Sequence, residues 1–292
     1  MRRLLYLGVV TCLVGWLAWR YGAMISPFGA VTSPTPNPED GKVASGIYTS
    51  RYFDLSYPLP QGWTEGVAGP LPSHSGYYVL STLIPMSEFT GTILVAAQDM
   101  FFAAKPHGTA AAAANDFRQA MSEIEGMTID REPSEVSIAD RPVQRVDFSG
   151  VGLHRAMFVA EIRCHLVSFN LTTRDPELLV TLALSLSHLS FAGGRDAASS
   201  IPECVKNYAV AENLLWKVEP AIVGPIVTPI PVRITVSPDG GVKHVHVIRA
   251  TADQRKSIEG ALRQWKFRPY EITGRAVEIE TGLVFPFKPT EM

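Results

Sequence analysis

Histidine, serine and cysteine are the residue types in this chain that could do chemistry, and their spacing limits what that chemistry could be. His74 lies between two serines in a Gly/Ser stretch, and no acidic residue lies nearby in sequence to complete a catalytic set. His244 and His246 lie two apart in an alternating stretch, so their side chains share one face of a strand and could supply two ligands to a metal. Because no third ligand accompanies them, we expect a solvent-facing pair on a hairpin.

The sequence contains no motif that assembles a reaction centre. It lacks a Gly-x-Ser-x-Gly elbow, a phosphate-binding loop, a His-Glu-x-x-His pair and a Cys-x-x-Cys pair. We therefore expect a protein that is not an enzyme, with no catalytic residue, no metal and no cofactor.

Three cysteines remain to be placed. Cys12 lies in the apolar first segment, whereas Cys164 and Cys204 lie in what should be an oxidising compartment. These two either form a disulfide that ties the end of one domain to the start of the next, or stay as two buried thiols.

The first segment has the pattern of a membrane signal. Arg2 and Arg3 precede an uncharged run over residues 4–19, and Arg20 follows it. No clear Ala-x-Ala cleavage site follows, so we favour an uncleaved anchor at 1–24 over a cleaved signal. The positive-inside rule places the rest of the chain on the periplasmic face of the inner membrane.

The net charge of −2 provides no field that would attract nucleic acid, and we expect no nucleic acid as a partner.

The remaining chain divides into two folded segments. A Pro-rich linker over 25–46 precedes an α+β sandwich domain at 47–193, and a Gly/Ser-rich linker over 194–204 precedes a small domain at 205–292. In the larger domain, alternating strands surround an Ala-rich helix at 108–126, and a helix capped by Asp175 and begun by Pro176 closes the domain. This order indicates an antiparallel sheet with helices packed on it.

The small domain begins with a β-hairpin over residues 232–247, which turns at a Pro-Asp-Gly-Gly stretch. An amphipathic helix with Ile258, Leu262 and Trp265 on one stripe follows, and residues 275–287 form a third strand. We therefore expect a three-stranded antiparallel sheet with one helix. Aromatic residues at such spacings usually pack in a core, and we expect the same of Trp63 and Trp216.

The combination of "DGGVKHVHVI", "ALRQWKFRP" and "GRAVEIETGLVFPF", in this order, resembles the C-terminal domain of TonB-type energy transducers. The resemblance implies a periplasmic module that contacts an outer-membrane receptor. The chain departs from the family because residues 4–21 contain no Ser or His that could meet a proton-driven motor, and because the linker is short. More loosely, "FDLSYPLPQGW" is similar to the opening of PsbP-like α/β domains.

A small sheet with one covered face leaves an open edge that can accept an extended peptide strand. The residues expected to bind a partner in this way are Thr273, Gly274, Glu278, Glu280 and Gly282. The Pro-rich stretch before the hairpin could instead cover this edge. Two copies of the chain could also pair through such edges as a homodimer.

Two functions remain open on these grounds. The first is a TonB-type module that transmits energy to an outer-membrane receptor. The second is an envelope scaffold or accessory protein that uses the same module without energy coupling, which the departures in the anchor and the linker favour.

Overall fold

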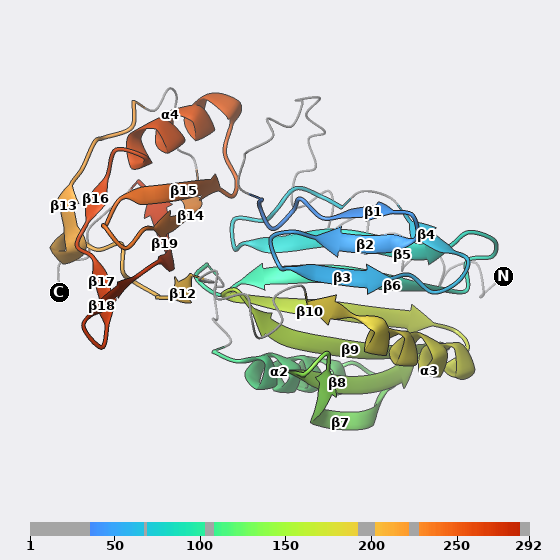
Figure 1. Cartoon of the computed structure of the whole chain (residues 1–292). Helices are drawn as coiled ribbons and strands as arrows, with labels where there is room; N and C mark the ends of the chain where they lie inside the picture. Colours follow the sequence, from blue (N-terminus) through green and yellow to red (C-terminus); the bar gives the residue numbers. More distant parts are fainter. Residues whose placement is uncertain (1–35, 67–68, 103–107, 192–201, 222–227, 287–292) are drawn as a thin grey trace. The chain divides into compact units, whose positions relative to one another are not determined.

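A computed structural model describes residues 36–66, 69–102, 108–191, 202–221 and 228–286 of the chain (Figure 1). Residues 35–292 form one compact unit. Within the described ranges, no helix has the length and apolar character needed to cross a bilayer. The predicted anchor at residues 4–19 lies outside these ranges.

The larger part of the unit is built on a seven-stranded antiparallel sheet in the order β4-β5-β6-β10-β9-β8-β7. A second, four-stranded sheet has the order β1-β2-β3-β11. Along the chain the elements are β1 (Lys42–Ala44), β2 (Ile47–Ser50), β3 (Leu55–Pro58), β4 (Trp63–Glu65), β5 (Tyr77–Pro85), β6 (Gly91–Asp99), α2 (Ala110–Ser122), β7 (Met127–Ile138), β8 (Arg141–Gly150), β9 (Leu153–Ile162), β10 (His165–Thr173), α3 (Pro176–Ser185), the single-turn helix η1 (Leu186–His188) and β11 (Ser190–Phe191).

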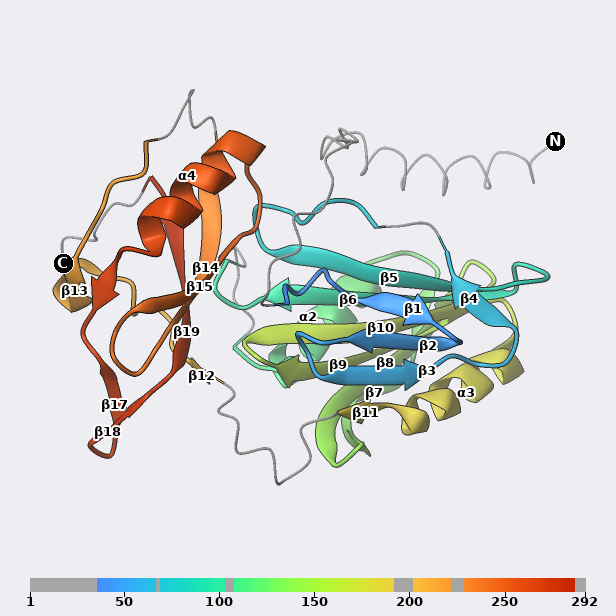
Figure 2. The same cartoon turned by 45° about the horizontal axis from the view of Figure 1, so that its top comes forward.

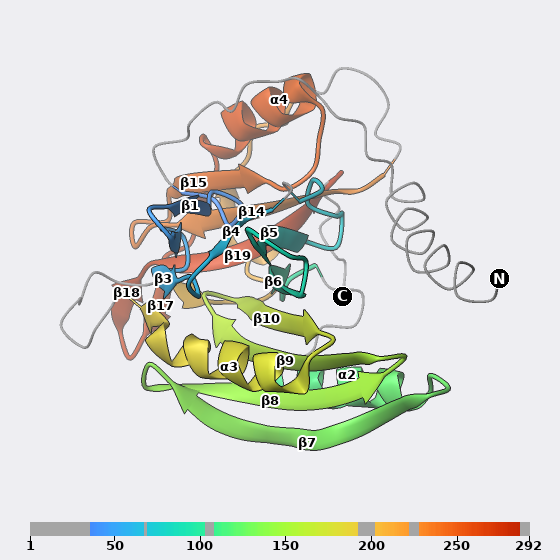
Figure 3. The same cartoon turned by 90° about the vertical axis from the view of Figure 1, so that its right-hand side faces the viewer.

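The two faces of the seven-stranded sheet have different covers. Ala110 and Ala114 of α2 pack with Met157 of β9 in one cluster of buried residues. Leu182 of α3 packs with Phe158, the next residue of β9, in another cluster. Because successive side chains of a strand point to opposite faces, α2 and α3 cover opposite sides of the sheet (Figure 3). Strands β1 to β3 pack on the same face as α3 (Figure 2).

The last part of the chain forms a four-stranded sheet in the order β12-β19-β14-β15, with α4 against β15 (Figure 1). Two further pairs of short strands, β13-β16 and β17-β18, are formed by residues that lie between β12 and β19 in sequence. The elements are β12 (Glu203–Cys204), the single-turn helix η2 (Ala211–Asn213), β13 (Leu214–Trp216), β14 (Ile230–Val236), β15 (Val242–Val247), α4 (Ala252–Leu262), β16 (Lys266–Phe267), β17 (Tyr270–Ile272), β18 (Arg275–Val277) and β19 (Ile279–Phe285).

The helices begin where side chains satisfy the free amides of their first turn. The Asp175 carboxylate accepts a hydrogen bond from the Glu177 amide at 2.9 Å, and a proline occupies the first turn of α3. In α4, Thr251 and Gln254 form a capping box in which each side chain binds the other residue's backbone amide.

The expected fold class is confirmed at the level of a mixed α+β protein that is mostly antiparallel sheet with few helices. The linkers differ from expectation where the structure describes them. β1 lies inside the predicted linker 25–46, and β12 lies inside the predicted linker 194–204. β12 also makes the last sheet four-stranded instead of three-stranded. The domain boundaries drawn at these linkers stay predictions.

Candidate functional site

The last sheet has an apolar face and a polar face, and both are buried. Alternation in β14 puts Ile234 on the apolar face, where it packs with Trp265 and the helix α4. The opposite face carries Arg233, which lies across from His246 and Gly282, and Thr235, which lies across from His244 and Glu280. We call these six residues the polar face: Arg233, Thr235, His244, His246, Glu280 and Gly282.

Arg233 is the centre of the polar face and is only 1% exposed. Its Nη2 lies 2.6 Å from Asp99 Oδ2 at the end of β6, and its Nη1 lies 2.8 Å from Glu280 Oε2 on β19. Its guanidinium carbon lies 4.5 Å from the centre of the Phe101 ring. A planar guanidinium can satisfy two carboxylates and an aromatic face at once, which a lysine could not do.

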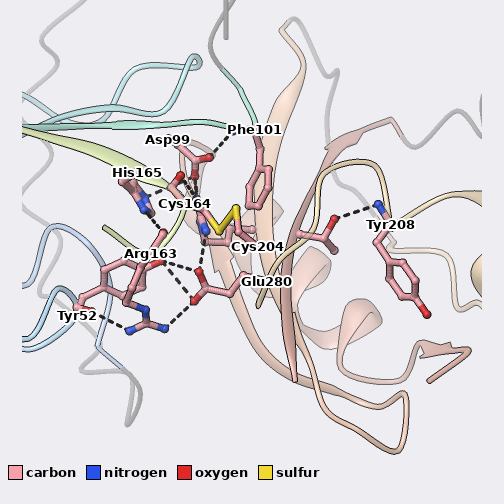
Figure 4. Close-up of a disulfide and its surroundings, with 11 residues drawn as sticks. Tyr52, Asp99, Phe101, Arg163, Cys164, His165, Cys204, Tyr208 and Glu280 are labelled. Carbon is pink, nitrogen blue, oxygen red and sulfur yellow. Dashed lines mark hydrogen bonds and ion pairs between the residues drawn. A yellow bond between two sulfur atoms is a disulfide. The ribbon is translucent and has the colours of Figure 1, made fainter. Parts of the chain in front are cut away.

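The turn between β9 and β10 supplies the other side of the cluster. Arg163 and Cys164 both have positive φ, 48° and 58°, as a two-residue hairpin turn requires. Arg163 Nη2 lies 2.6 Å from Glu280 Oε1, and its Nη1 donates to the Tyr52 carbonyl at 2.7 Å (Figure 4). His165 Nε2 lies 3.7 Å from Asp99 Oδ2.

The charges of this cluster balance within the protein. Two guanidinium groups, of Arg163 and Arg233, face two carboxylates, of Asp99 and Glu280. Burial raises the pKa of Asp99, and the charge of Arg233 opposes that rise. Burial and the charge of Arg233 together hold the pKa of His165 well below its ordinary value, so His165 is neutral at pH 7.

A disulfide joins Cys164 to Cys204 beside this cluster, with 5.6 Å between their Cα atoms (Figure 4). Of the two alternatives that the sequence left open, the structure has the disulfide. Cys164 is buried, whereas Cys204 is exposed on β12. The bond therefore links the turn between β9 and β10 to the short strand that runs along β19.

β12 covers only the start of the β19 edge. It pairs in parallel with Ile279 and Glu280, and the amides of Glu203 and Val205 donate to the carbonyls of Glu278 and Glu280 at 2.9 and 3.0 Å. Along a strand, the backbone N–H and C=O groups of alternate residues point to the same edge. The groups of Gly282 and Val284 therefore point to the edge of β19 that the Glu280 carbonyl faces. In the part of the chain that the structure describes, no strand pairs with them there.

The structure places the predicted partner-binding residues in two locations. Thr273 and Gly274 form the turn of the β17-β18 hairpin with φ of 51° and 78°, and both are exposed. Glu278, Glu280 and Gly282 lie together at β19. Glu278 pairs with Lys243 through a 2.7 Å contact.

Glu280 differs most from its expected role. Its side chain is buried and ion-paired within the protein, and its carbonyl already accepts the Val205 amide. With β12 in place, it therefore has no free group to offer a partner. Gly282 lies against Phe101 and Phe102, and only its backbone can take part in pairing.

Two further expectations are corrected by burial. His244 and His246 do not face solvent, because both lie on the buried polar face, and His246 Nε2 lies 2.9 Å from Glu39 Oε1. Trp216 was expected in the core, but it is 63% exposed, whereas Trp63 and Trp265 are buried as expected.

Sequence reasoning missed Arg233, Asp99, Arg163 and His165. The available signal was the spacing of Arg233 and Thr235 on one strand with His244 and His246 on the next, which puts four polar residues on one sheet face. Such a face is ordinarily exposed to water, so the pattern alone does not indicate burial. Within the described ranges, no group of three or more His, Cys, Asp or Glu residues could hold a metal ion.

No family model and no curated protein matches this chain. Several solved structures are similar to part of it, among them the following two. Cyanobacterial PsbP (CyanoP) from Synechocystis sp. PCC 6803 has a TM-score of 0.38 and 15% identity, covering 57% of this chain and 98% of that one. LpqN, described as involved in cell envelope biogenesis of Mycobacterium tuberculosis, has a TM-score of 0.30 and 13% identity, covering 47% of this chain and 82% of that one.

Both TM-scores are low, so neither structural similarity supports a conclusion about the function of this chain. None of the reported likenesses is to a TonB C-terminal domain, so that resemblance stays a prediction from the sequence.

Proposed function

We propose that this chain is an envelope protein-binding module of TonB type, anchored in the inner membrane through residues 4–19 and facing the periplasm. It binds an extended strand of another envelope protein along β19. The disulfide supports an oxidising compartment, because such bonds persist outside the cytosol. The basic residues Arg2 and Arg3 before the apolar run support an orientation in which the rest of the chain faces the periplasm. No catalytic step is part of the proposal.

The observation that carries the proposal is the edge of β19 beyond Glu280. Val284 is 40% exposed between the buried residues Leu283 and Phe285, and its backbone points to the side that β12 leaves after Glu280. The other side of β19 pairs with β14 over its whole length, so the strand is held in place before any partner arrives. A fixed strand with unpaired amides is the arrangement that strand addition requires.

The polar face favours the uncoupled form of this role. Its contacts with Asp99, Arg163 and Cys164 hold the last sheet against the preceding part of the chain. An envelope accessory protein can use a sheet held in this way, whereas an energy transducer needs a module that moves freely toward an outer-membrane receptor. We therefore place the accessory role first and the energy-coupled contact with a receptor second.

The test is capture of envelope proteins by the full chain in detergent, compared between Val284→Pro and Val284→Thr. Proline removes the backbone donor, whereas threonine keeps it together with the β-branched shape. We expect the proline variant to lose a captured protein that the threonine variant retains. Equal capture by both variants would exclude strand addition at this edge. If collapse of the proton gradient in intact cells abolishes the contact, the energy-coupled form replaces the accessory one.

A further inference from the structure

We propose that the Cys164–Cys204 disulfide is a reducible site for an envelope dithiol, and that its reduction releases Glu203–Val205 from β19. We call residues 203–205 the latch. The inference rests on the proposed function only in assigning a partner strand to the edge that the latch vacates. The redox step itself depends on the disulfide and on β12.

The two cysteine residues differ in their exposure to solvent. Cys204 is exposed on the latch, whereas Cys164 is 7% exposed inside the turn between β9 and β10. A dithiol therefore approaches the disulfide from the side of Cys204. Since exchange requires attack of a thiolate on an accessible sulfur, Cys204 is the site of attack and Cys164 is the leaving group.

The step balances without any further reactant. A thiolate of the dithiol bonds to Cys204 Sγ, the Cys164–Cys204 bond breaks, and the Cys164 thiolate takes a proton. The second thiol of the reductant, as its thiolate, then attacks the reductant's sulfur in the mixed disulfide and releases Cys204, which also takes a proton. The dithiol loses two electrons and becomes a disulfide, and the protein gains two thiols.

The latch has few other contacts that would hold it in place. Backbone hydrogen bonds connect it to β19, among them those from the Glu203 amide to the Glu278 carbonyl and from the Val205 amide to the Glu280 carbonyl. Glu203 and Cys204 are exposed, and only Val205 packs partly against the apolar cluster of the last sheet. Ordering a short segment costs conformational entropy that a few such bonds barely offset. After the latch, the chain is next held to β19 at Tyr208. Its amide donates a hydrogen bond to Thr281 Oγ1 at 3.3 Å.

Release of the latch lengthens the edge that a partner can use. With the disulfide intact, the edge begins at Gly282. With the disulfide reduced, the carbonyls of Glu278 and Glu280 are free as well, and the accepting edge runs from Glu278 to Val284. The redox state of one bond thus sets the length of strand that β19 can pair with.

Hydrogen exchange of the full chain, with and without dithiothreitol, tests the release directly. We expect reduction to lower the protection of the Glu203 and Val205 amides at least tenfold, to that of an open segment, while the Val232 and Ile234 amides of β14 stay far more protected than the latch. A double variant, Cys164→Ser with Cys204→Ser, should show the same low protection without reductant. Unchanged protection of the latch overturns the proposal. Loss of protection in β14 down to the level of the latch also overturns it, because the sheet would then open together with the latch.

Two further measurements separate the steps. Incubation with glutathione and mass mapping of the adduct should find it on Cys204, and an adduct on Cys164 would contradict the assigned site of attack. Capture of envelope proteins should increase when dithiothreitol is present. If the exchange result holds and no protein is captured in either redox state, the proposed strand addition is wrong. The release of residues 203–205 on reduction is then still supported.

Discussion

Arg233 has two carboxylate partners and almost no contact with water. We predict that Arg233→Met lowers the free energy of unfolding by about 3–5 kcal/mol, because Asp99 loses its only guanidinium partner among the described residues while remaining buried. Glu280 keeps Arg163 and loses less. Urea unfolding followed by tryptophan fluorescence measures the change.

The matched control is Arg118→Met. Arg118 pairs with Glu132 through a 2.9 Å contact between two largely exposed side chains, and such pairs contribute little. The variant should unfold close to the wild-type midpoint. If both methionine variants lose the same stability, the buried cluster is not a special source of stability.

His244 provides a pH-dependent contribution with a definite sign. Burial and the nearby charges of His246 and Arg263 lower the pKa of His244 to about 4 in the folded chain, from an ordinary value near 6.5. Between these values His244 binds more protons in the unfolded state than in the folded state, so its contribution to stability falls as the pH drops from 6.5 to 4. The full shift corresponds to about 3 kcal/mol as an upper limit.

We predict that His244→Leu removes part of this pH dependence. Unfolding free energies measured between pH 7 and pH 4 should fall less steeply for the variant than for the wild type. His188→Leu, the same exchange of residue types at an exposed position, is the comparison substitution. Parallel slopes for wild type and His244→Leu would contradict the assignment.

At the scale of elements, Gly282 is where β19 meets the end of β6. A Cβ at this position would lie 2.8 Å from Phe101 Cβ and 2.8 Å from Phe102 Cζ, closer than such atoms approach one another. Phe101 Cβ is fixed to the backbone and cannot turn away. We predict that Gly282→Ala lowers the free energy of unfolding by about 1–3 kcal/mol, as overpacking does, in the same urea experiment.

Gly260→Ala is the opposite case within the same part of the chain. Gly260 lies in α4, and a Cβ there would meet no atom within 4 Å. Alanine should therefore stabilise the helix by up to about 1 kcal/mol. A loss of stability at both glycines would show that close contact is not the cause at Gly282.

The elements that the sequence predicts well are those whose signals are local. The hairpin β14-β15 follows from alternation and a Gly-rich turn, and α3 follows from Asp175 and Pro176. β12 could not be predicted, because two exposed residues carry no periodicity and the strand exists only through its pairing with β19. The polar face could not be predicted as buried for a related reason: its cover comes from residues distant in sequence, such as Asp99 and Arg163.

At the scale of the whole unit, two clusters of apolar residues are joined through polar groups and through Ile248, which follows β15 and packs in the cluster of the larger part. Trp63 belongs to the cluster of the larger part and Trp265 to that of the last sheet. Between them lie the buried ion pairs of Arg233 and the disulfide. Because buried ion pairs require correct geometry to offset their desolvation, they fix how the two parts are joined more than they stabilise either part.

The disulfide should decide whether the two parts unfold together. It closes a loop of 40 residues, and the chain-entropy model gives such a crosslink about 4 kcal/mol. We predict that the double variant Cys164→Ser with Cys204→Ser loses this stability and also separates the urea transitions reported by Trp63 and Trp265, each kept as the single tryptophan of the chain. The wild type should show coincident transitions, and dithiothreitol should leave the double variant unchanged. Coincident transitions in the double variant would show that the ion pairs of the polar face are sufficient to couple the two parts.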